Sequence, residues 1–282
     1  MLMCTLRYDA PMSATLTTIH LFPLKSGAPV VVTEAAVEPR GLAGDRRWMV
    51  VDADGKFVTG RQIAALTLVR ARPDGDALQL EAPGMPALRV EKPRADGARI
   101  GTAVWGAAVT PLLADDVAHA WLSTFLRMPL RLVHMDAACV RKVKGKYDGQ
   151  YGHDEDVVSF ADAFPLLLIS QAALDFLNAK LARPVPMLRF RPNLVVAGTA
   201  PHAEDGWKRV RIGAVEFEVV KACTRCVFTT VDFERGERDP TGEPLRTLTT
   251  YRRTPDGVTF GQNLIPRGTG TLRVGDAFEV LA

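Results

Sequence analysis

Residues 221–232 read Lys-Ala-Cys-Thr-Arg-Cys-Val-Phe-Thr-Thr-Val-Asp, which places two of the four cysteines, Cys223 and Cys226, three positions apart. A thiolate is the nucleophile and soft-metal ligand among side chains, and adjacent positive charge lowers the pKa of a cysteine. Lys221 and Arg225 supply that charge locally. Residues 207–220 alternate as a strand, so we expect the cysteines at a strand end, where sites are commonly built. This segment is the first place to expect chemistry.

The residues alone leave three interpretations of the cysteine pair open. A structural zinc site needs about four ligands, but Cys4 and Cys139 are isolated and no closely spaced histidine pair exists. A redox C-x-x-C pair normally opens a helix in a thioredoxin-like unit, whereas residues 227–231 predict a strand or irregular chain. The third interpretation is two small, buried, apolar cysteines.

Composition sets broad limits on the class of protein. The chain has 282 residues, of which 47% are hydrophobic and 24% charged, as in a soluble globular protein of one large or two modest domains. Because 35 basic residues face 32 acidic ones, nucleic-acid binding by bulk charge is not expected, although a local basic pocket for a small anion is compatible with this balance.

The same sequence carries no targeting signal that we can identify. No apolar run approaches the roughly 18 residues that span a bilayer, so no membrane span is expected. Residues 1–12 lack a secretory pattern, and residues 1–11 are expected to be an irregular extension or an upstream start choice. Four cysteines with one close pair are not a disulfide framework. We therefore expect a cytoplasmic location.

Short strands dominate the first hundred residues. Period-two alternation and Asp-Gly turn signals separate them. The expected strands cover residues 15–22, 47–52, 77–81, 88–91 and 104–111. Many short strands at close spacing are typical of a small barrel or sandwich.

Two helices are expected to interrupt the strands. The first covers 116–127, between Asp115 and Pro129, and the second covers 171–181, with Ser170 as N-cap. The inward faces are expected to carry Val117, Trp121, Leu122 and Phe125 in the first helix and Leu174, Leu177 and Leu181 in the second. Strands resume at 193–196, 209–220 and 271–281. The predicted class is α+β and β-rich, with a boundary between about residues 114 and 140.

Three basic clusters accompany the cysteines. They occupy residues 22–27, 41–48 and 189–193, each beside a predicted strand. Lys and Arg next to Gly, Ser or Asn at strand ends suit an anionic ligand, and Arg binds phosphate bidentately. Taken singly, each cluster is more often solvated surface charge, and Asp45-Arg46 could be a local ion pair. The usual nucleotide-binding glycine loops are absent from the sequence.

The segment Cys-Thr-Arg-Cys-Val-Phe-Thr-Thr-Val-Asp resembles the signature of MOSC-domain proteins, in the branch of the mitochondrial amidoxime-reducing component and its bacterial relatives. Further motifs stand in the family's order over nearly the whole chain. They are Phe-Pro-Leu-Lys-Ser (22–26), Gly-Asp-Arg-Arg-Trp-Met-Val (44–50), Thr-Gly-Arg-Gln (59–62), Phe-Arg-Pro-Asn (190–193), Glu-Asp-Gly-Trp (204–207) and Pro-Leu-Arg-Thr-Leu (244–248). Several motifs in register are far more specific than one C-x-x-C.

The resemblance implies an N-terminal MOSC β-barrel domain at 13–130 and a MOSC-type β-barrel domain with a few helices at 131–282. It also implies a molybdenum cofactor, molybdopterin, held between them. Cys226 would be the thiolate ligand of molybdenum and the catalytic centre, with Cys223 as structural support.

The implied cofactor-binding residues follow the family's motifs. Those that match positions binding the pterin and its phosphate are Lys25, Ser26, Arg46 and Arg191, with Asn193, Thr224 and Arg225 close by. Asp162 lies in a cofactor-contacting stretch. The chain departs from the family after Asp162, where relatives have Thr-Ser, and at 261–263, where Gly-Gln-Asn replaces Gly-Gln-Tyr. These departures put hydroxyl contacts and a tyrosine contact in doubt.

The implied activity is that of a molybdenum-dependent oxidoreductase. Its small N-hydroxylated substrates would be hydroxylamines, amidoximes or N-hydroxylated bases, reduced by oxygen-atom removal. The chain lacks C-x4-C-x2-C spacing, so no fused iron–sulfur cluster is expected and electrons would come from a separate flavin or iron–sulfur protein. The basic residues 141–146 would be a docking loop or, more often, an ordinary solvated loop. The alternative function is a molybdenum cofactor- or sulfur-carrier module without its own turnover.

Overall fold

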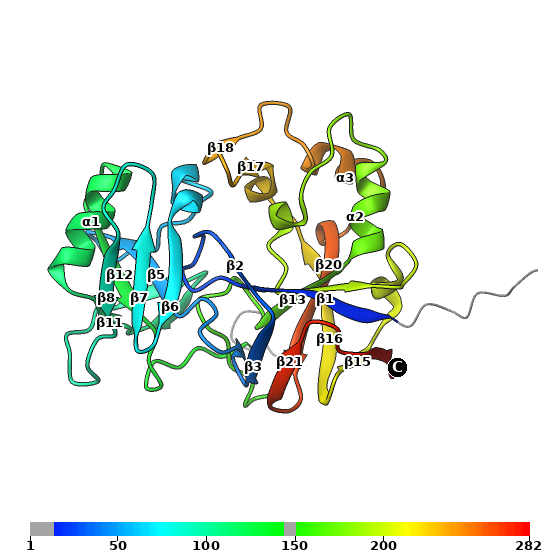
Figure 1. Ribbon diagram of the computed structural model, residues 1–282, viewed down its shortest axis with the longest axis horizontal. Helices are drawn as coiled ribbons and strands as arrows, with labels where there is room; N and C mark the ends of the chain where they lie inside the picture. The colour runs from blue at the N-terminus through cyan, green and yellow to red at the C-terminus, as the bar shows by residue number, and fades with distance from the viewer. Residues whose placement is uncertain (1–13, 144–150) are drawn as a thin grey trace, which may run out of the picture.

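The computed structural model describes residues 14–143 and 151–282, so the expected N-terminal extension and residues 144–146 of the basic segment lie outside it. Within this range, the largest sheet runs in the order β2-β1-β14-β13-β20-β16-β15-β22, with β19 paired to β20. It forms the right half of the view in Figure 1. Its strands are β1 (Thr15–Leu21), β2 (Val30–Val32), β13 (Leu166–Ser170), β14 (Leu194–Ala197), β15 (Arg209–Ile212), β16 (Val215–Thr224), β19 (Arg253–Thr254), β20 (Gly257–Pro266) and β22 (Phe278–Val280).

The other half is built from smaller antiparallel sheets and one helix (Figure 1). Its elements are β5 (Trp48–Asp52), β6 (Arg70–Asp74), β7 (Ala77–Glu81), β8 (Leu88–Glu91), β9 (Thr102–Val104), β10 (Ala107–Val109), β11 (Leu112–Leu113), α1 (Asp116–Leu126) and β12 (Leu130–His134), with the 3-10 turn η1 (Ala64–Leu68). Buried side chains of β5, β7 and β12 pack with Trp121 and Leu122 of α1 in one core. The fold class, α+β and rich in strands, is confirmed.

The N-terminal strands cross into the sheet of the C-terminal half. β1 pairs antiparallel with β14, from Thr15 opposite Ala197 to Ile19 opposite Leu194. β3 (Glu34–Glu38) pairs with both β4 (Gly41–Leu42) and β21 (Gly270–Arg273). Leu16 and Ile19 share a buried cluster with Phe217. Residues 15–42 therefore help to build the second half, and the division of the chain at residue 130 stays a prediction.

Both expected helices form, with their predicted caps. The Asp115 carboxylate accepts a hydrogen bond from Ala118 N at 2.7 Å, and Ser170 Oγ accepts one from Ala173 N at 3.1 Å. The expected inward position of Val117 is wrong, because its side chain is 61% exposed. The buried stripe of α1 is Ala118, Trp121, Leu122 and Leu126, which follows the helical period. α2 (Gln171–Asn178) ends earlier than expected.

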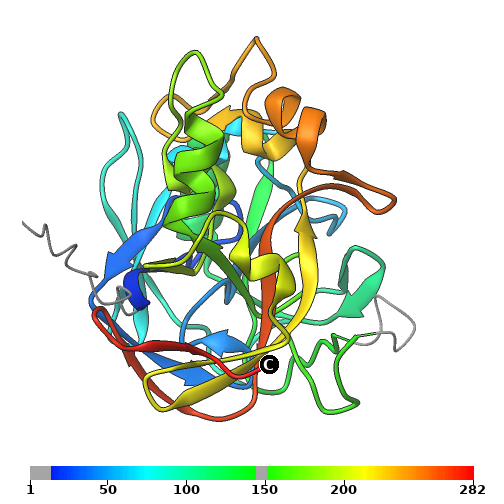
Figure 2. The same ribbon diagram turned by 90° about the vertical axis from the view of Figure 1, so that its right-hand side faces the viewer.

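Several elements differ from the sequence-based expectation. The predicted single strand at 104–111 is a β9–β10 hairpin that turns at Trp105 and Gly106, both with positive φ. The strands β13 and β20 and the helix α3 (Leu245–Tyr251) were not expected. α2 and α3 lie together at one end of the large sheet in both views (Figures 1 and 2). The rings of Phe176 and Tyr251 meet there, 5.7 Å apart.

Glu204 holds the N-cap residue of α2, Ser170, by hydrogen bonds. Its carboxylate is fully buried and accepts hydrogen bonds from Ser170 N at 3.2 Å and Ser170 Oγ at 2.9 Å. Burial raises the pKa of Glu204, so the folded state keeps a proton that the unfolded state releases. Stability from this group is present below its unfolded pKa and is lost as pH rises through its folded pKa.

We expect Glu204→Gln to remove part of the pH dependence of folding. As pH rises above the ordinary pKa of a glutamate, the free energy of unfolding should fall less in this variant than in the parent protein. Urea titrations at several pH values measure the difference, with Glu237→Gln on an exposed strand as the control. If both variants keep the parent's pH profile, Glu204 is not the titrating group.

Candidate functional site

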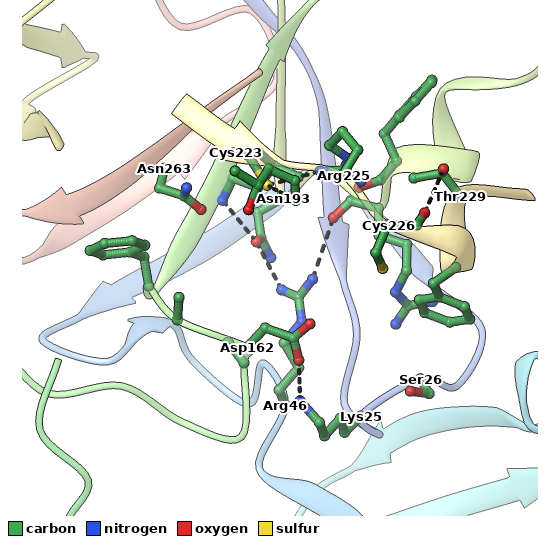
Figure 3. A pocket seen from close by; sticks show the side chains of 18 of the residues that line it. Lys25, Ser26, Arg46, Asp162, Asn193, Cys223, Arg225, Cys226, Thr229 and Asn263 are labelled. Carbon is green, nitrogen blue, oxygen red and sulfur yellow. Dashed lines mark hydrogen bonds and ion pairs between the residues drawn. The ribbon is translucent and has the colours of Figure 1, made fainter. Parts of the chain in front are cut away.

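A cavity of about 380 Å³ lies between the two halves of the molecule. All nine residues that the sequence singled out line it, some of them shown in Figure 3. They are Lys25, Ser26, Arg46, Asp162, Arg191, Asn193, Thr224, Arg225 and Cys226. They come from the loop after β1, the loop before β5, the segment before β13, the chain around η3 (Met187–Phe190) and the end of β16. The structure thus assembles one site from five separated segments.

Three of these residues have left-handed backbone conformations. The φ angles of Ser26, Arg46 and Arg191 are 66°, 48° and 55°. Each costs on the order of 1–3 kcal/mol for a residue other than glycine, and such conformations concentrate at ligand sites. Backbone hydrogen bonds hold the last two, from Arg46 N to Phe22 O at 2.7 Å and from Arg191 N to Leu188 O at 3.1 Å.

Arg46 is fixed by both an ion pair and an amide. Its Nη1 lies 2.5 Å from Asp45 Oδ2 and donates to Asn193 Oδ1 at 2.8 Å. Asn193 in turn donates to His20 O at 3.2 Å. The suspected Asp45–Arg46 pair therefore exists, and it holds a guanidinium at the cavity wall rather than on open surface.

Arg191 is a second buried cation of the wall. Its guanidinium lies 4.1 Å from the centre of the Phe22 ring and donates through Nη1 to Gly27 O at 2.7 Å. Burial, together with the nearby charge of Arg46, lowers the pKa of Arg191. Its Nη2 is buried and has no hydrogen-bond partner among the described residues. A buried donor without a partner favours an acceptor supplied by a ligand.

The two cysteines have different surroundings. Arg225 donates to Cys223 Sγ at 2.9 Å and to Phe190 O at 2.6 Å, while its Nε is buried without a partner in the described chain. Cys226 Sγ has no hydrogen bond to any described residue and points into the cavity (Figure 3). Cys223 is thus engaged with the protein, whereas the Cys226 thiol is open to a ligand.

A short turn presents Cys226. The 3-10 turn η5 (Val227–Thr230) begins directly after it, and Thr229 donates to Cys226 O through N at 3.0 Å and through Oγ1 at 2.9 Å. The expectation of strand or irregular chain at 227–231 was wrong for most of this segment. The turn is one 3-10 turn rather than the α-helix that opens at a thioredoxin-type cysteine pair.

Asp162 and Lys25 form an ion pair that lines the cavity. Lys25 Nζ lies 2.5 Å from Asp162 Oδ1 and donates to Phe160 O at 2.7 Å. Burial lowers the pKa of Lys25 to about 8, against the opposing charge of Asp162. Burial alone would raise the pKa of Asp162, but Lys25 and Arg61 hold it well below its usual range. The side chain of Asp162 remains half exposed.

Among the other residues that line the cavity, Arg61, Trp105 and Arg189 were not predicted as site residues. Arg61 donates to Asp162 Oδ2 at 2.9 Å and stacks on the Trp105 ring at 4.3 Å. Trp105 Nε1 donates to Asp162 Oδ1 at 3.1 Å. Arg189 donates to Thr230 O at 3.0 Å and pairs with Asp232, whose carboxylate also caps the turn after β17 (Val231–Asp232). The motif at 59–62 was the available signal for Arg61.

Gly60 lets the two halves close around this cavity. A Cβ atom at Gly60 would lie 2.2 Å from Cε2 of Phe228, whose ring lines the cavity just after Cys226. We expect Gly60→Ala to destabilise the fold by about 1–3 kcal/mol, because the ring would have to leave its place. Urea unfolding measures the cost. Gly101→Ala, where a Cβ meets nothing within 4 Å, is the matched control. Equal stability of both variants would contradict the contact.

Comparison with known proteins places this chain in a family. The model of the MOSC N-terminal beta barrel domain matches residues 13–129, and the model of the MOSC domain matches residues 155–279. The Mitochondrial amidoxime-reducing component 1 of Xenopus laevis is 34% identical over 95% of this chain and 82% of its own length. The human protein of the same name is 33% identical over 95% and 83%.

Solved structures are more distant. The YUAD protein from Bacillus subtilis covers 95% of this chain and 94% of its own, at 10% identity and a TM-score of 0.40. That likeness is too weak to inform the site.

The described residues contain no helix that is long and apolar enough to cross a membrane. The matched relatives carry mitochondrial names, so the cytoplasmic location stays a prediction.

The two domain matches and the identity over nearly the full length agree: this chain belongs to the MOSC-domain family and is a relative of the mitochondrial amidoxime-reducing components.

Proposed function

We propose that this protein is a molybdenum-cofactor-dependent reductase of small N-hydroxylated compounds. The name of its relatives, amidoxime-reducing components, supports the reaction class. The observation that carries the proposal is the cavity, where an open thiol and buried cations from five segments face one another. Substrates, on this proposal, are hydroxylamines, amidoximes or N-hydroxylated bases.

The residues present fit the cofactor. A soft metal bound by pterin sulfur accepts a protein thiolate, and Cys226 offers one with no competing partner in the described chain. Phosphate needs charge-assisted donors, and two buried guanidinium nitrogens, Arg191 Nη2 and Arg225 Nε, have no protein acceptor among the described residues. The chemistry of the donor set thus matches a metal-bearing, phosphate-bearing ligand.

Each cavity residue then has a proposed role. Cys226 holds the metal, and Lys25, Ser26, Arg46 and Arg191 bind the pterin and its phosphate. The other proposed contacts are Asn193, Thr224, Arg225 and Asp162. With a pKa of about 8, Lys25 remains mostly protonated at neutral pH and adds its charge to the anion site. Asn193 accepts a hydrogen bond from Arg46 and so fixes its guanidinium, and Arg225 donates a hydrogen bond to the Cys223 thiol.

The cofactor, when bound, supplies two-electron removal of oxygen from the substrate, while the protein supplies orientation and electrostatics. Electrons come, on this proposal, from a separate flavin or iron–sulfur protein. The half-exposed carboxylate of Asp162, held by Lys25, Arg61 and Trp105, gives the cavity a fixed hydrogen-bond acceptor beside its cations.

The test begins with the protein purified from a molybdenum-replete host. Metal and pterin content are measured first, followed by reduction of a hydroxylamine and an amidoxime with an artificial electron donor. We expect stoichiometric molybdenum and turnover. Bound molybdenum without turnover favours the carrier alternative, and stoichiometric zinc without pterin overturns both.

A further inference from the structure

A second hollow, of about 510 Å³, adjoins the functional cavity between β16, β20 and the end of α3. Lys221 and Ala222 line both spaces. None of the nine proposed cofactor residues lines the second one. It is therefore a separate place on the protein, although it touches the strand that ends at the cysteines.

The side chains of this hollow carry an excess of positive charge. Its carboxylates are those of Asp205 and Asp256. Arg252 binds Asp205 bidentately at 2.6 and 2.9 Å, and Lys221 lies 2.5 Å from Asp256. Two more cations, Lys208 and Arg253, line the same space, and among the described residues no ion pair within 4.0 Å joins either side chain to an acidic group. Both are exposed and remain available to an anion.

The positions of the neighbouring polar groups are already fixed. Besides Arg252, Asp205 accepts from Gln262 Nε2 at 2.9 Å, so the carboxylate that could compete for the free cations is occupied. Lys221 Nζ also contacts Tyr151 Oη at 3.1 Å. Because these side chains are held in place before binding, ordering them would cost a ligand little binding free energy.

Aromatic residues give the hollow apolar surface. It is lined by Tyr151, Trp207 and Tyr251. The Tyr251 hydroxyl is buried and has no hydrogen-bond partner in the part of the chain that the structure describes. Rings beside unpaired cations suit a molecule that combines an oxyanion with a flat apolar body.

We propose that this hollow binds a small organic oxyanion, with Lys208 and Arg253 as its charge partners. A phosphate monoester and a carboxylate share the required chemistry. The site is independent of the proposed reductase function, because its residues do not touch the cofactor cavity apart from the Lys221–Ala222 strand segment.

The test is calorimetric titration of the full chain, as purified, with phenyl phosphate, benzoate and neutral benzyl alcohol at low ionic strength. We expect saturable binding of the anions and none of the alcohol. Tighter binding of phenyl phosphate than of benzoate identifies a phosphate ligand, and the reverse order identifies a carboxylate. Equal binding of the alcohol overturns the proposal, as does a lack of saturable binding at millimolar concentration.

A pair of double variants locates the site. Lys208→Ala with Arg253→Ala should weaken anion binding about tenfold or more, since charge-assisted hydrogen bonds are lost. Arg70→Ala with Arg72→Ala removes two exposed charges from β6 in the other half and should leave binding unchanged. Thermal unfolding checks that both variants fold. Unchanged affinity in the first variant would place the anion elsewhere and contradict the proposal.

Discussion

Replacing Cys226 with serine is expected to abolish reduction and to weaken retention of the metal while the protein stays folded. The thiol has no hydrogen bond to the described protein and lines the cavity, so its loss removes a ligand rather than a structural contact. A serine hydroxyl is a hard donor and a poor substitute for a thiolate toward a soft metal. Loss of an outer-shell partner of a metal ligand already lowers metal affinity or activity roughly 10–100-fold, so we expect Cys226→Ser to lower the activity by more than that.

Cys223→Ser, three positions earlier in the chain, is the matched variant. Cys223 Sγ accepts from Arg225 and packs beside the core under α2, so its replacement should disturb the cavity wall without removing a ligand. Molybdenum and pterin content, turnover and thermal unfolding are measured for both variants. Equal and complete loss in both, with folding intact, would tell against Cys226 as the sole protein ligand.

Much of the site was accessible from the sequence because chemistry and motif coincide at each position. The segments at 22–26, 44–50, 190–193 and 223–232 each carry a cation or thiol beside a predicted strand. The sequence could not show that these segments lie together. Their proximity depends on the pairing of β1 with β14, in which Thr17 and Val195 form a hydrogen bond although they are 178 residues apart in the chain. Such long-range pairing leaves no local pattern.

The central strand β20 was missed for a physical reason. Its burial is nearly continuous, so it lacks the alternation that marks a half-exposed strand. Gly261 in its middle has a φ of 78°, and a Cβ there would lie 2.8 Å from Leu168 O of β13. A glycine in mid-strand resembles a turn signal in the sequence, although here it permits close approach of two strands.

Arg61 was missed because its role depends on tertiary structure. It sits in a turn between a glycine and a glutamine, which resembles a solvated loop. Only the fold brings its guanidinium to Asp162, 101 residues away, and to the face of Trp105 on the β9–β10 hairpin. The hairpin itself was hidden because its turn residue is a tryptophan with a φ of 51° rather than an asparagine or aspartate.

Replacing Asp45 with alanine is expected to cost about 3–5 kcal/mol of folding free energy, because it leaves a buried charge unpaired. The Asp45 side chain is fully buried: Oδ1 accepts from Phe22 N at 2.8 Å and Oδ2 pairs with Arg46. It therefore ties the loop carrying Lys25 and Ser26 to the left-handed turn carrying Arg46. Its loss should loosen both walls of the cavity at once.

Two controls separate the charge from the packing. Asp45→Asn keeps an acceptor for Phe22 N and should cost less, while Asp54→Ala breaks only the exposed Lys56–Asp54 pair at 3.6 Å and should cost little. Urea unfolding of the three variants compares their free energies of unfolding. If Asp45→Ala is no worse than Asp54→Ala, then Asn193 and the Phe22 ring hold Arg46 by themselves. The cation's place in the cavity would then be set by the C-terminal half of the chain and by stacking, rather than by its own neighbour.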